Sequence, residues 1–276
     1  MDDKARRFRA LHEGPGAFIL PNPWDAGTAR ILAACGFAAL ATTSAGLAFA
    51  GGVRDGGTSR DDMLAHCALI VGATPLPVSA DLENGFGDSP EAVAETIHAA
   101  AAVGLAGGSI EDHTGRRDAP IYDFSLAVER IAAAVEARQA LPGDFVLTAR
   151  AENFLWGRPD LDDTIRRLQA FEAAGADVLY APGLPDIDAV RAVCSAVSRP
   201  VNVVIGIGAA RFTRDELAAA GVRRISIGSS LARLAYGRFA RAAQAMQREG
   251  RFDFLDEAMG FAEIEAFFTS FAARER

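Results

Sequence analysis

Two acidic clusters stand at the ends of short apolar runs, each just before glycine-containing segments. Asp81 and Glu83 close the run VSADLE, and Glu111 and Asp112 close GGSIED. Alternate residues of a strand point to the same face, so the carboxylates at 81 and 83 would leave a strand end together. Two such ends in succession predict a hard-cation site, with Asp81 as a direct ligand and Glu83 and Glu111 as ligands directly or through water.

The available donor atoms favour Mg2+ or Mn2+ over zinc. The four histidines are scattered, and the sequence has no HExxH or CxxC pattern. Oxygen ligands suit Mg2+ and Mn2+, and Mg2+ commonly binds one or two carboxylates together with waters and substrate.

Arg150, in TARAE, is a cation at the end of another apolar run. Its guanidinium could grip a carboxylate in bidentate fashion or stabilise the charge of an enolate oxygen. The alternative for Arg150 is a salt bridge that holds this part of the fold together. The alternative for the acids is helix capping, or ion pairs with loop residues Arg54, Arg116 and Arg117.

Strand-like and helix-like runs alternate along the whole chain. Nearly continuous apolar strands that alternate with helices predict a parallel sheet with right-handed crossovers. Alanine-rich helix ends are followed by Gly36, Gly104, Gly175 and Gly221, which we expect in the left-handed conformation. The expected strands lie near 17–23, 38–44, 77–83, 107–112, 145–152, 177–182, 201–206 and 224–230, and the expected helices include 25–35, 59–71, 90–103, 125–139, 161–174, 186–197 and 213–220.

Eight such units predict a (β/α)8 barrel of TIM type, with residues 1–276 as a single domain. A doubly wound open sheet is the alternative, and it would need an interruption that the pattern lacks. The apolar segment at about 250–276 predicts a helical extension that covers either the barrel bottom or a neighbouring subunit. In a barrel, residues at the carboxyl ends of the strands form the active site.

Composition excludes several partners. The net charge is −8 without a basic run, which argues against nucleic acid and anionic membranes. No apolar run approaches the roughly 20 residues that span a bilayer, and the start of the chain has no signal-peptide pattern. Three scattered cysteines, Cys35, Cys67 and Cys194, are expected to be buried thiols of a cytoplasmic protein.

The motifs NPWDAG, ATTSAGLA, GGVRDGG, VSADLENGFG, GGSIED, TARAENF and RISIGSSLARLAYG occur in this order. With them the chain resembles the isocitrate lyase/phosphoenolpyruvate mutase superfamily over nearly its full length. The resemblance implies a (β/α)8 barrel whose terminal helices commonly swap between subunits of a homo-dimer or homo-tetramer. It also implies Mg2+ and a small α-oxo or α-hydroxy carboxylate substrate that passes through an enolpyruvate-like state.

The resemblance also assigns roles to individual residues. It implies that Asp81 binds the metal, that Glu83 lies at a second metal-site position, and that Glu111 completes the shell through water. Arg150, Asp55 and Glu111 form the expected catalytic set, with Asp55 near the metal or its waters. The expected substrate-binding set is Ser44, Ala45, Gly46, Arg150 and Asn202.

The loop after Glu111 departs from the superfamily pattern. It reads EDHTGRRDAPIYD and lacks the Lys-Lys-Cys-Gly-His sequence of the lyases, as well as the lysine and asparagine of the mutases. His113, Arg116 and Arg117 are the polar substitutes in this expected gating loop. Position 182 is Pro, where lyases commonly have Glu.

The expected function is a Mg2+-dependent lyase-type enzyme that acts on a small carboxylate. Decarboxylation of an oxaloacetate-like acid depends least on catalytic groups from the altered loop, because the leaving group, CO2, is neutral. The alternatives are phosphoenolpyruvate or carboxyvinyl-phosphonate mutase chemistry, methylisocitrate-type retro-aldol cleavage without a loop thiol, and a silent dicarboxylate-binding barrel. A phosphate-binding barrel, with glycines at 206 and 208 and serines at 229 and 230, is a further alternative.

Overall fold

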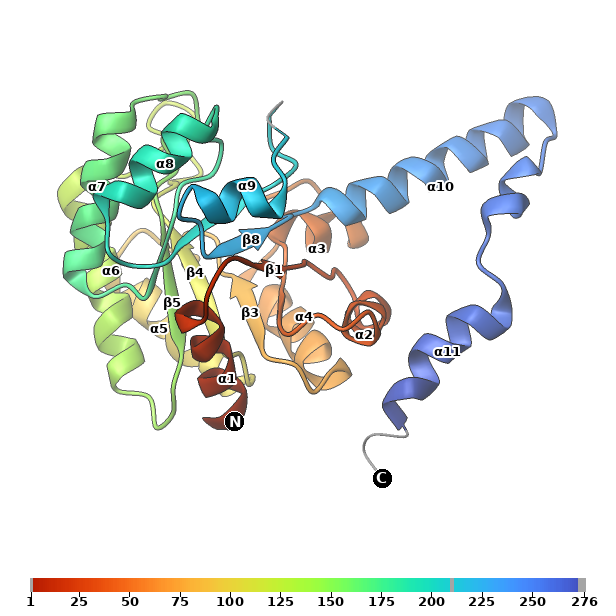
Figure 1. Ribbon diagram of the computed structural model, residues 1–276, viewed down its shortest axis with the longest axis horizontal. Helices are drawn as coiled ribbons and strands as arrows, with labels where there is room; N and C mark the ends of the chain where they lie inside the picture. Colours follow the sequence, from red (N-terminus) through yellow and green to blue (C-terminus); the bar gives the residue numbers. More distant parts are fainter. Residues whose placement is uncertain (1, 209–210, 273–276) are drawn as a thin grey trace.

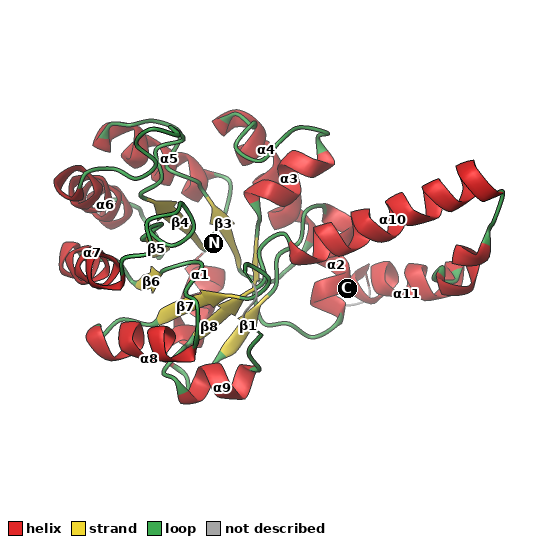
Figure 2. Cartoon of the chain, turned by 90° about the horizontal axis from the view of Figure 1, so that it is seen from above, coloured by secondary structure: helices red, strands yellow, loops and turns green. Residues whose placement is uncertain are grey.

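The chain forms a nearly closed α/β barrel of eight parallel strands (Figure 2). This computed structural model describes residues 2–208 and 211–272. The strand order is β1-β8-β7-β6-β5-β4-β3-β2, and the Ala41 amide donates to Pro21 O (3.0 Å) across the seam between the edge strands. The predicted barrel is confirmed. The strands are β1 (Phe18–Leu20), β2 (Leu40–Ala41), β3 (Val78–Asp81), β4 (Gly107–Glu111), β5 (Val146–Arg150), β6 (Val178–Tyr180), β7 (Val201–Val204) and β8 (Arg224–Ser226).

Helices surround the sheet, and those expected between the strands are present. Gly36, Gly104, Gly175 and Gly221 take the predicted left-handed conformation, with φ between 88° and 108°. Within residues 2–208 and 211–272, no helix is both long and apolar enough to cross a membrane. The helices are α1 (Asp2–Glu13), α2 (Ala26–Ala34), α3 (Ser44–Ala50), α4 (Arg60–Ala73), α5 (Pro90–Ala102), α6 (Phe124–Gln139), α7 (Leu161–Ala174), α8 (Ile187–Ala196), α9 (Arg214–Ala219), α10 (Ser230–Glu249), the 3-10 helix η1 (Asp253–Glu257) and α11 (Phe261–Ala272).

Helix α1 closes the amino-terminal end of the barrel. Phe8 is fully buried against Leu20, Val146 and Val178, which come from three different strands. The expectation that the C-terminal segment could cover the barrel bottom is therefore wrong, because α1 fills that place.

The C-terminal segment forms an arm beside the barrel (Figure 1). Helix α10 extends away from the barrel, and α11 returns to pack against α2, where Phe268 approaches Gly27. The predicted helical extension is confirmed up to residue 272, and residues 273–276 lie outside the described part. Large apolar side chains of the arm are exposed, namely Leu234, Phe239, Phe252, Leu255 and Phe261.

The cysteines occupy three different environments. Cys67 is buried and Cys194 is half-buried, but Cys35 is exposed. The expectation of three buried thiols is wrong for Cys35, because this residue ends α2 where the helix meets solvent.

Candidate active site

A cavity of about 170 Å3 opens at the carboxyl ends of β3, β4 and β5. Five of its lining side chains are carboxylic acids, and one is an arginine. The lining residues are Ser44, Asp55, Gly56, Asp81, Glu83, Glu111, His113, Arg150, Glu152, Leu155 and Trp156. The cavity therefore brings together most of the predicted site and gathers an excess of negative charge.

Arg150 is the electrostatic centre of this mouth cavity. It forms ion pairs through Nη1 with Asp81 Oδ1 (3.0 Å), through Nη2 with Glu111 Oε2 (3.0 Å) and through Nε with Glu152 Oε1 (2.8 Å). Burial alone would lower the pKa of Arg150, but its carboxylate neighbours raise that pKa well above the ordinary value. The guanidinium therefore stays charged, and it also lies 4.9 Å from the centre of the Tyr180 ring.

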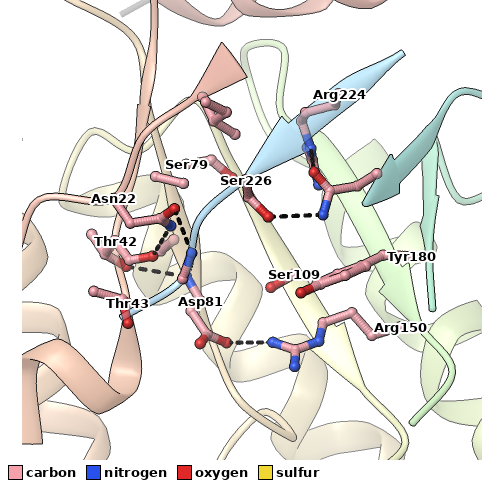
Figure 3. A pocket seen from close by; sticks show the side chains of 15 residues that line it. Asn22, Thr42, Thr43, Ser79, Asp81, Ser109, Arg150, Tyr180, Arg224 and Ser226 are labelled. Carbon is pink, nitrogen blue, oxygen red and sulfur yellow. Dashed lines mark hydrogen bonds and ion pairs between the residues drawn. The ribbon is translucent and has the colours of Figure 1, made fainter. Parts of the chain in front are cut away.

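Asp81 ends β3 and bridges two parts of the predicted site. Its Oδ1 pairs with Arg150, while Oδ2 accepts a hydrogen bond from Ser44 Oγ (2.8 Å) at the start of α3. Figure 3 shows Asp81 and Arg150 facing one another from neighbouring sides of the barrel interior. The strand ends thus bring together the predicted metal ligand and the predicted substrate-binding serine.

Glu83 lines the same cavity, but its backbone does not have the expected strand conformation. The strand ends at Asp81, and Glu83 takes a left-handed conformation with φ 48°, which is uncommon outside glycine. The expectation that strand alternation aligns the two side chains is therefore wrong. Burial, followed by the nearby Asp81 and Glu111 charges, raises the pKa of Glu83 to about 8.

Glu111 links the arginine to the loop after β4. Burial favours a raised pKa for Glu111, but Arg150 and the His113 hydrogen bond outweigh it, so the pKa is lowered. Its Oε1 lies 3.5 Å from His113 Nδ1. The His113 ring in turn stacks on Trp156, with ring centroids 3.7 Å apart.

Asp112 turns away from the cavity, although it stands beside Glu111 in sequence. Its Oδ2 pairs with Arg167 Nη1 (2.9 Å), and its Oδ1 accepts from the Glu152 amide (2.8 Å). Burial raises the pKa of Asp112 to about 6 despite the Arg167 charge. Only Glu111 of this acidic pair therefore faces the mouth cavity.

Glu152 is a fully buried acid that the predicted site set did not include. Burial raises the pKa of Glu152 to about 8. The negative charges of Glu111 and Asp112 add to this effect, whereas the charge of Arg150 acts against it. Glu152 Oε2 has no hydrogen-bond partner within the described part of the chain. Its place two residues after Arg150 in TARAE was the available signal, although β5 itself ends at Arg150.

Ser44, Ala45 and Gly46, which we expect to bind the carboxylate of the substrate, lie at the edge of the cavity. The Gly46 amide donates to Thr43 Oγ1 (3.3 Å), and a side chain at Gly46 would collide with Thr43 and Trp24. Ser44 lines the cavity, and Ala45 follows it in the first turn of α3. Asp55 lines the outer side, where burial and then the Asp81 and Glu111 charges raise its pKa.

The predicted gating loop divides into two parts. His113 lines the mouth cavity, whereas Arg116 pairs with Asp88 (2.7 Å) outside it, and Arg117 is exposed. The loop arginines therefore do not neutralise the mouth acids as the alternative supposed, and Arg150 does so instead.

A second cavity of about 60 Å3 lies inside the barrel (Figure 3). Asp81 and Arg150 line both cavities, whereas Asn202 lines only the inner one. Asn202 Nδ2 donates to Ser226 Oγ (3.0 Å), and its Oδ1 accepts from Arg224 Nε (2.9 Å). Asn202 is thus apart from the mouth residues, and its substrate-binding role stays a prediction.

The donor set of the mouth cavity suits a hard divalent cation. No three His, Cys, Asp or Glu side chains of residues 2–208 and 211–272 are grouped so as to hold a metal by themselves. Five acids nevertheless line the cavity with one arginine, which pairs with three of them. The raised pKa values of Glu83 and Glu152 reflect burial and the neighbouring carboxylates. Mg2+ needs only one or two carboxylates when waters and substrate complete its shell, so the residues fit such an ion.

A barrel with a charged cavity at the carboxyl ends of its strands has the architecture of a (β/α)8 enzyme. Residues 8–247 match the family model of phosphoenolpyruvate phosphomutase. The chain therefore belongs to this family, within the isocitrate lyase/phosphoenolpyruvate mutase superfamily, as the resemblance predicted.

Similar proteins include both lyases and mutases. A crystal structure from Burkholderia cenocepacia J2315, provisionally described as a lyase/mutase, is 60% identical, with a TM-score of 0.95 and coverage of 97% of this chain and 96% of that one. The 2-methylisocitrate lyase of Escherichia coli K12 is 32% identical, covering 79% of this chain and 75% of the relative. The oxaloacetate decarboxylase of Ectopseudomonas mendocina is 28% identical, covering 80% and 77%.

Proposed function

We propose that the protein is a Mg2+-dependent lyase that acts on a small α-oxo or α-hydroxy carboxylate. The observation that carries this proposal is the mouth cavity, which five acids line and in which three of them pair with the buried Arg150. The family membership and the two lyase-type relatives, a 2-methylisocitrate lyase and an oxaloacetate decarboxylase, support the reaction class.

Asp81 would hold the metal directly, and Glu83 and Glu111 would hold it directly or through water. Mg2+, or Mn2+ in its place, supplies Lewis-acid charge to the substrate oxygens when bound. Asp55, which lines the same cavity, would orient water near that site. The excess of carboxylates supports these assignments, because like charges packed together are costly without a cation.

The substrate would lie between the Ser44 loop and Arg150. Ser44 and the main chain of Ala45 and Gly46 would bind its carboxylate, and Arg150 would face the oxo oxygen. A charged guanidinium stabilises negative charge that develops on that oxygen as a bond to the neighbouring carbon breaks. Three ion pairs fix the orientation of Arg150 in advance of substrate binding.

Decarboxylation is the reaction that this site supports best. The breaking C–C bond leaves its electron pair on the enolate that Arg150 faces, and CO2 departs without needing a proton. Retro-aldol cleavage needs a base on the substrate hydroxyl, and the loop EDHTGRRDAPIYD has no cysteine or lysine for that task. Mutase-type C–P chemistry is the second candidate, because the matching family model is that of a phosphomutase.

A metal-supplemented screen of small oxo- and hydroxy-acids tests the proposal, with pyruvate release as the readout. We expect oxaloacetate turnover that depends on Mg2+ or Mn2+ and is lost in Asp81→Ala. A phosphonate substrate followed by phosphorus NMR tests the mutase candidate. A folded protein that binds oxalate with Mg2+ but turns over no acid in the screen would instead favour a silent dicarboxylate-binding barrel.

A further inference from the structure

Arg130 of α6 is fully buried, and its guanidinium donates hydrogen bonds to main-chain carbonyl oxygens. Its Nη1 donates to Gly87 O (2.6 Å) and to Asp88 O, and its Nη2 donates to Asn84 O. Within the described part of the chain it forms no ion pair with a carboxylate, and its side chain is 1% exposed. All three carbonyls belong to the loop between β3 and α5, which starts directly after Asp81.

This loop has an unusual backbone. Glu83 and Phe86 both take left-handed conformations, with φ of 48° and 59°. Such conformations are costly for residues with a side chain, and they persist only where the surroundings hold them. Arg130 binds carbonyls on both sides of Phe86, and Thr96 Oγ1 holds the intervening Gly85 O (2.8 Å).

Tyr122 connects the same arginine to the predicted gating loop. The Arg130 guanidinium lies 4.2 Å from the centre of the Tyr122 ring. The Tyr122 hydroxyl donates to Asp88 Oδ1 (2.6 Å) and accepts from Asn84 Nδ2 (3.2 Å). Because Tyr122 belongs to the loop that carries His113, Arg130 contacts both the loop after β3 and the loop after β4.

We propose that Arg130 is a positioning residue of the metal site. Its bonds to the loop carbonyls hold Glu83 in the conformation that places its carboxylate beside Asp81 and Glu111. The buried clamp opposes an outward movement of Glu83 before a cation binds. This inference rests on the proposed function, because it concerns the divalent cation assigned there.

The test is the dissociation constant of Mn2+ for the full chain, measured by electron paramagnetic resonance or calorimetry. Arg130→Lys keeps the charge but cannot reach all three carbonyls. We expect it to weaken Mn2+ binding by about 10- to 100-fold, the usual effect of removing a group that orients a ligand. Tyr122→Phe, which keeps the ring and loses the hydroxyl, should give a smaller loss and serves if Arg130→Lys does not fold.

The matched control is Arg9→Lys at the opposite end of the barrel. Arg9 pairs with Asp144 (2.6 Å) and Asp177 (2.9 Å), far from the loop after β3. We expect this variant to melt at a lower temperature while its Mn2+ dissociation constant stays that of the wild type. If Arg130→Lys behaves in the same way, Arg130 is only structural and the proposal is overturned.

Hydrogen exchange of the amides at 84–88 gives a second readout that needs no metal. We expect faster exchange in Arg130→Lys than in the wild type and in Arg9→Lys. Unchanged exchange would overturn the clamp by itself. Absence of Mn2+ binding by the wild type would instead remove the proposed function, so the two failures are distinguishable.

Discussion

The imidazole ring of His113 lies flat on the indole of Trp156, with centroids 3.7 Å apart and planes inclined by 5°. The first ring belongs to the loop after β4, and the second belongs to the loop after β5. Both rings line the mouth cavity. A ligand that enters this cavity must therefore meet a contact between two loops that are separate in sequence.

This contact makes Trp156 a reporter of ligand binding. We expect oxalate with Mg2+ to change the intrinsic fluorescence of the wild type, because the environment of an indole that lines the cavity changes. Trp156→Phe should lose most of this response, although Trp24 remains as a second indole. A full response in Trp156→Phe would show that the ligand binds elsewhere.

Removal of the Arg150 charge should damage both stability and turnover. Arg150→Met leaves Asp81, Glu111 and Glu152 without their shared cation, and loss of one partner from a buried ion pair costs about 3–5 kcal/mol. We expect the free energy of unfolding in urea to fall by that amount. Loss of a donor to the developing charge should lower kcat by about 100- to 1000-fold. If Arg150→Met unfolds with the same free energy as the wild type, these ion pairs do not stabilise the fold and the prediction is wrong.

The crowded acids predict an unusual pH dependence for the metal-free protein. The pKa values of Glu83 and Glu152 are raised to about 8 from an ordinary value of 4.5, so the native state holds protons that the unfolded state has released. Stability should therefore decrease as pH rises from about 4.5 to 8. Melting temperatures measured with a chelator test this, and a rising temperature over that range would contradict it.

Two changes should make the melting temperature depend less steeply on pH. Glu83→Gln removes one of the groups that bind the extra proton, so the melting temperature should depend less on pH. Mg2+ should act in the same direction in the wild type, because a cation favours the ionised carboxylates. A slope that neither change affects would place the titrating group outside the mouth cavity.

The barrel could be predicted because each strand is a short apolar run followed by a turn, which is a local signal. Helix α1 was missed because its sequence, DDKARRFRALHE, is largely charged and buries only a narrow stripe that includes Ala5 and Phe8. Helix α3 was missed because SAGLAFA follows a predicted strand without a separating turn.

The site could be predicted in part, for the same reason. Asp81, Glu111 and Arg150 end strands, and parallel strands bring their ends together. The contacts of Trp156 and Arg130 could not be predicted, because they join loops and helices far apart in sequence. The left-handed turn at Glu83 also has no local signal, since glycine is the residue that usually marks such a conformation.

The C-terminal arm predicts self-association, and we propose that it packs against a second copy of the chain. Phe239 is 72% exposed on α10 and Phe261 is 88% exposed at the start of α11, and several large exposed apolar side chains on one segment are typical of an interface. We expect light scattering to show a homo-dimer or homo-tetramer, and Phe239→Ser to shift it toward the monomer. Arg191→Ser, on the exposed face of α8, is the control that should leave the mass unchanged. A monomeric wild type would contradict this assignment of the arm.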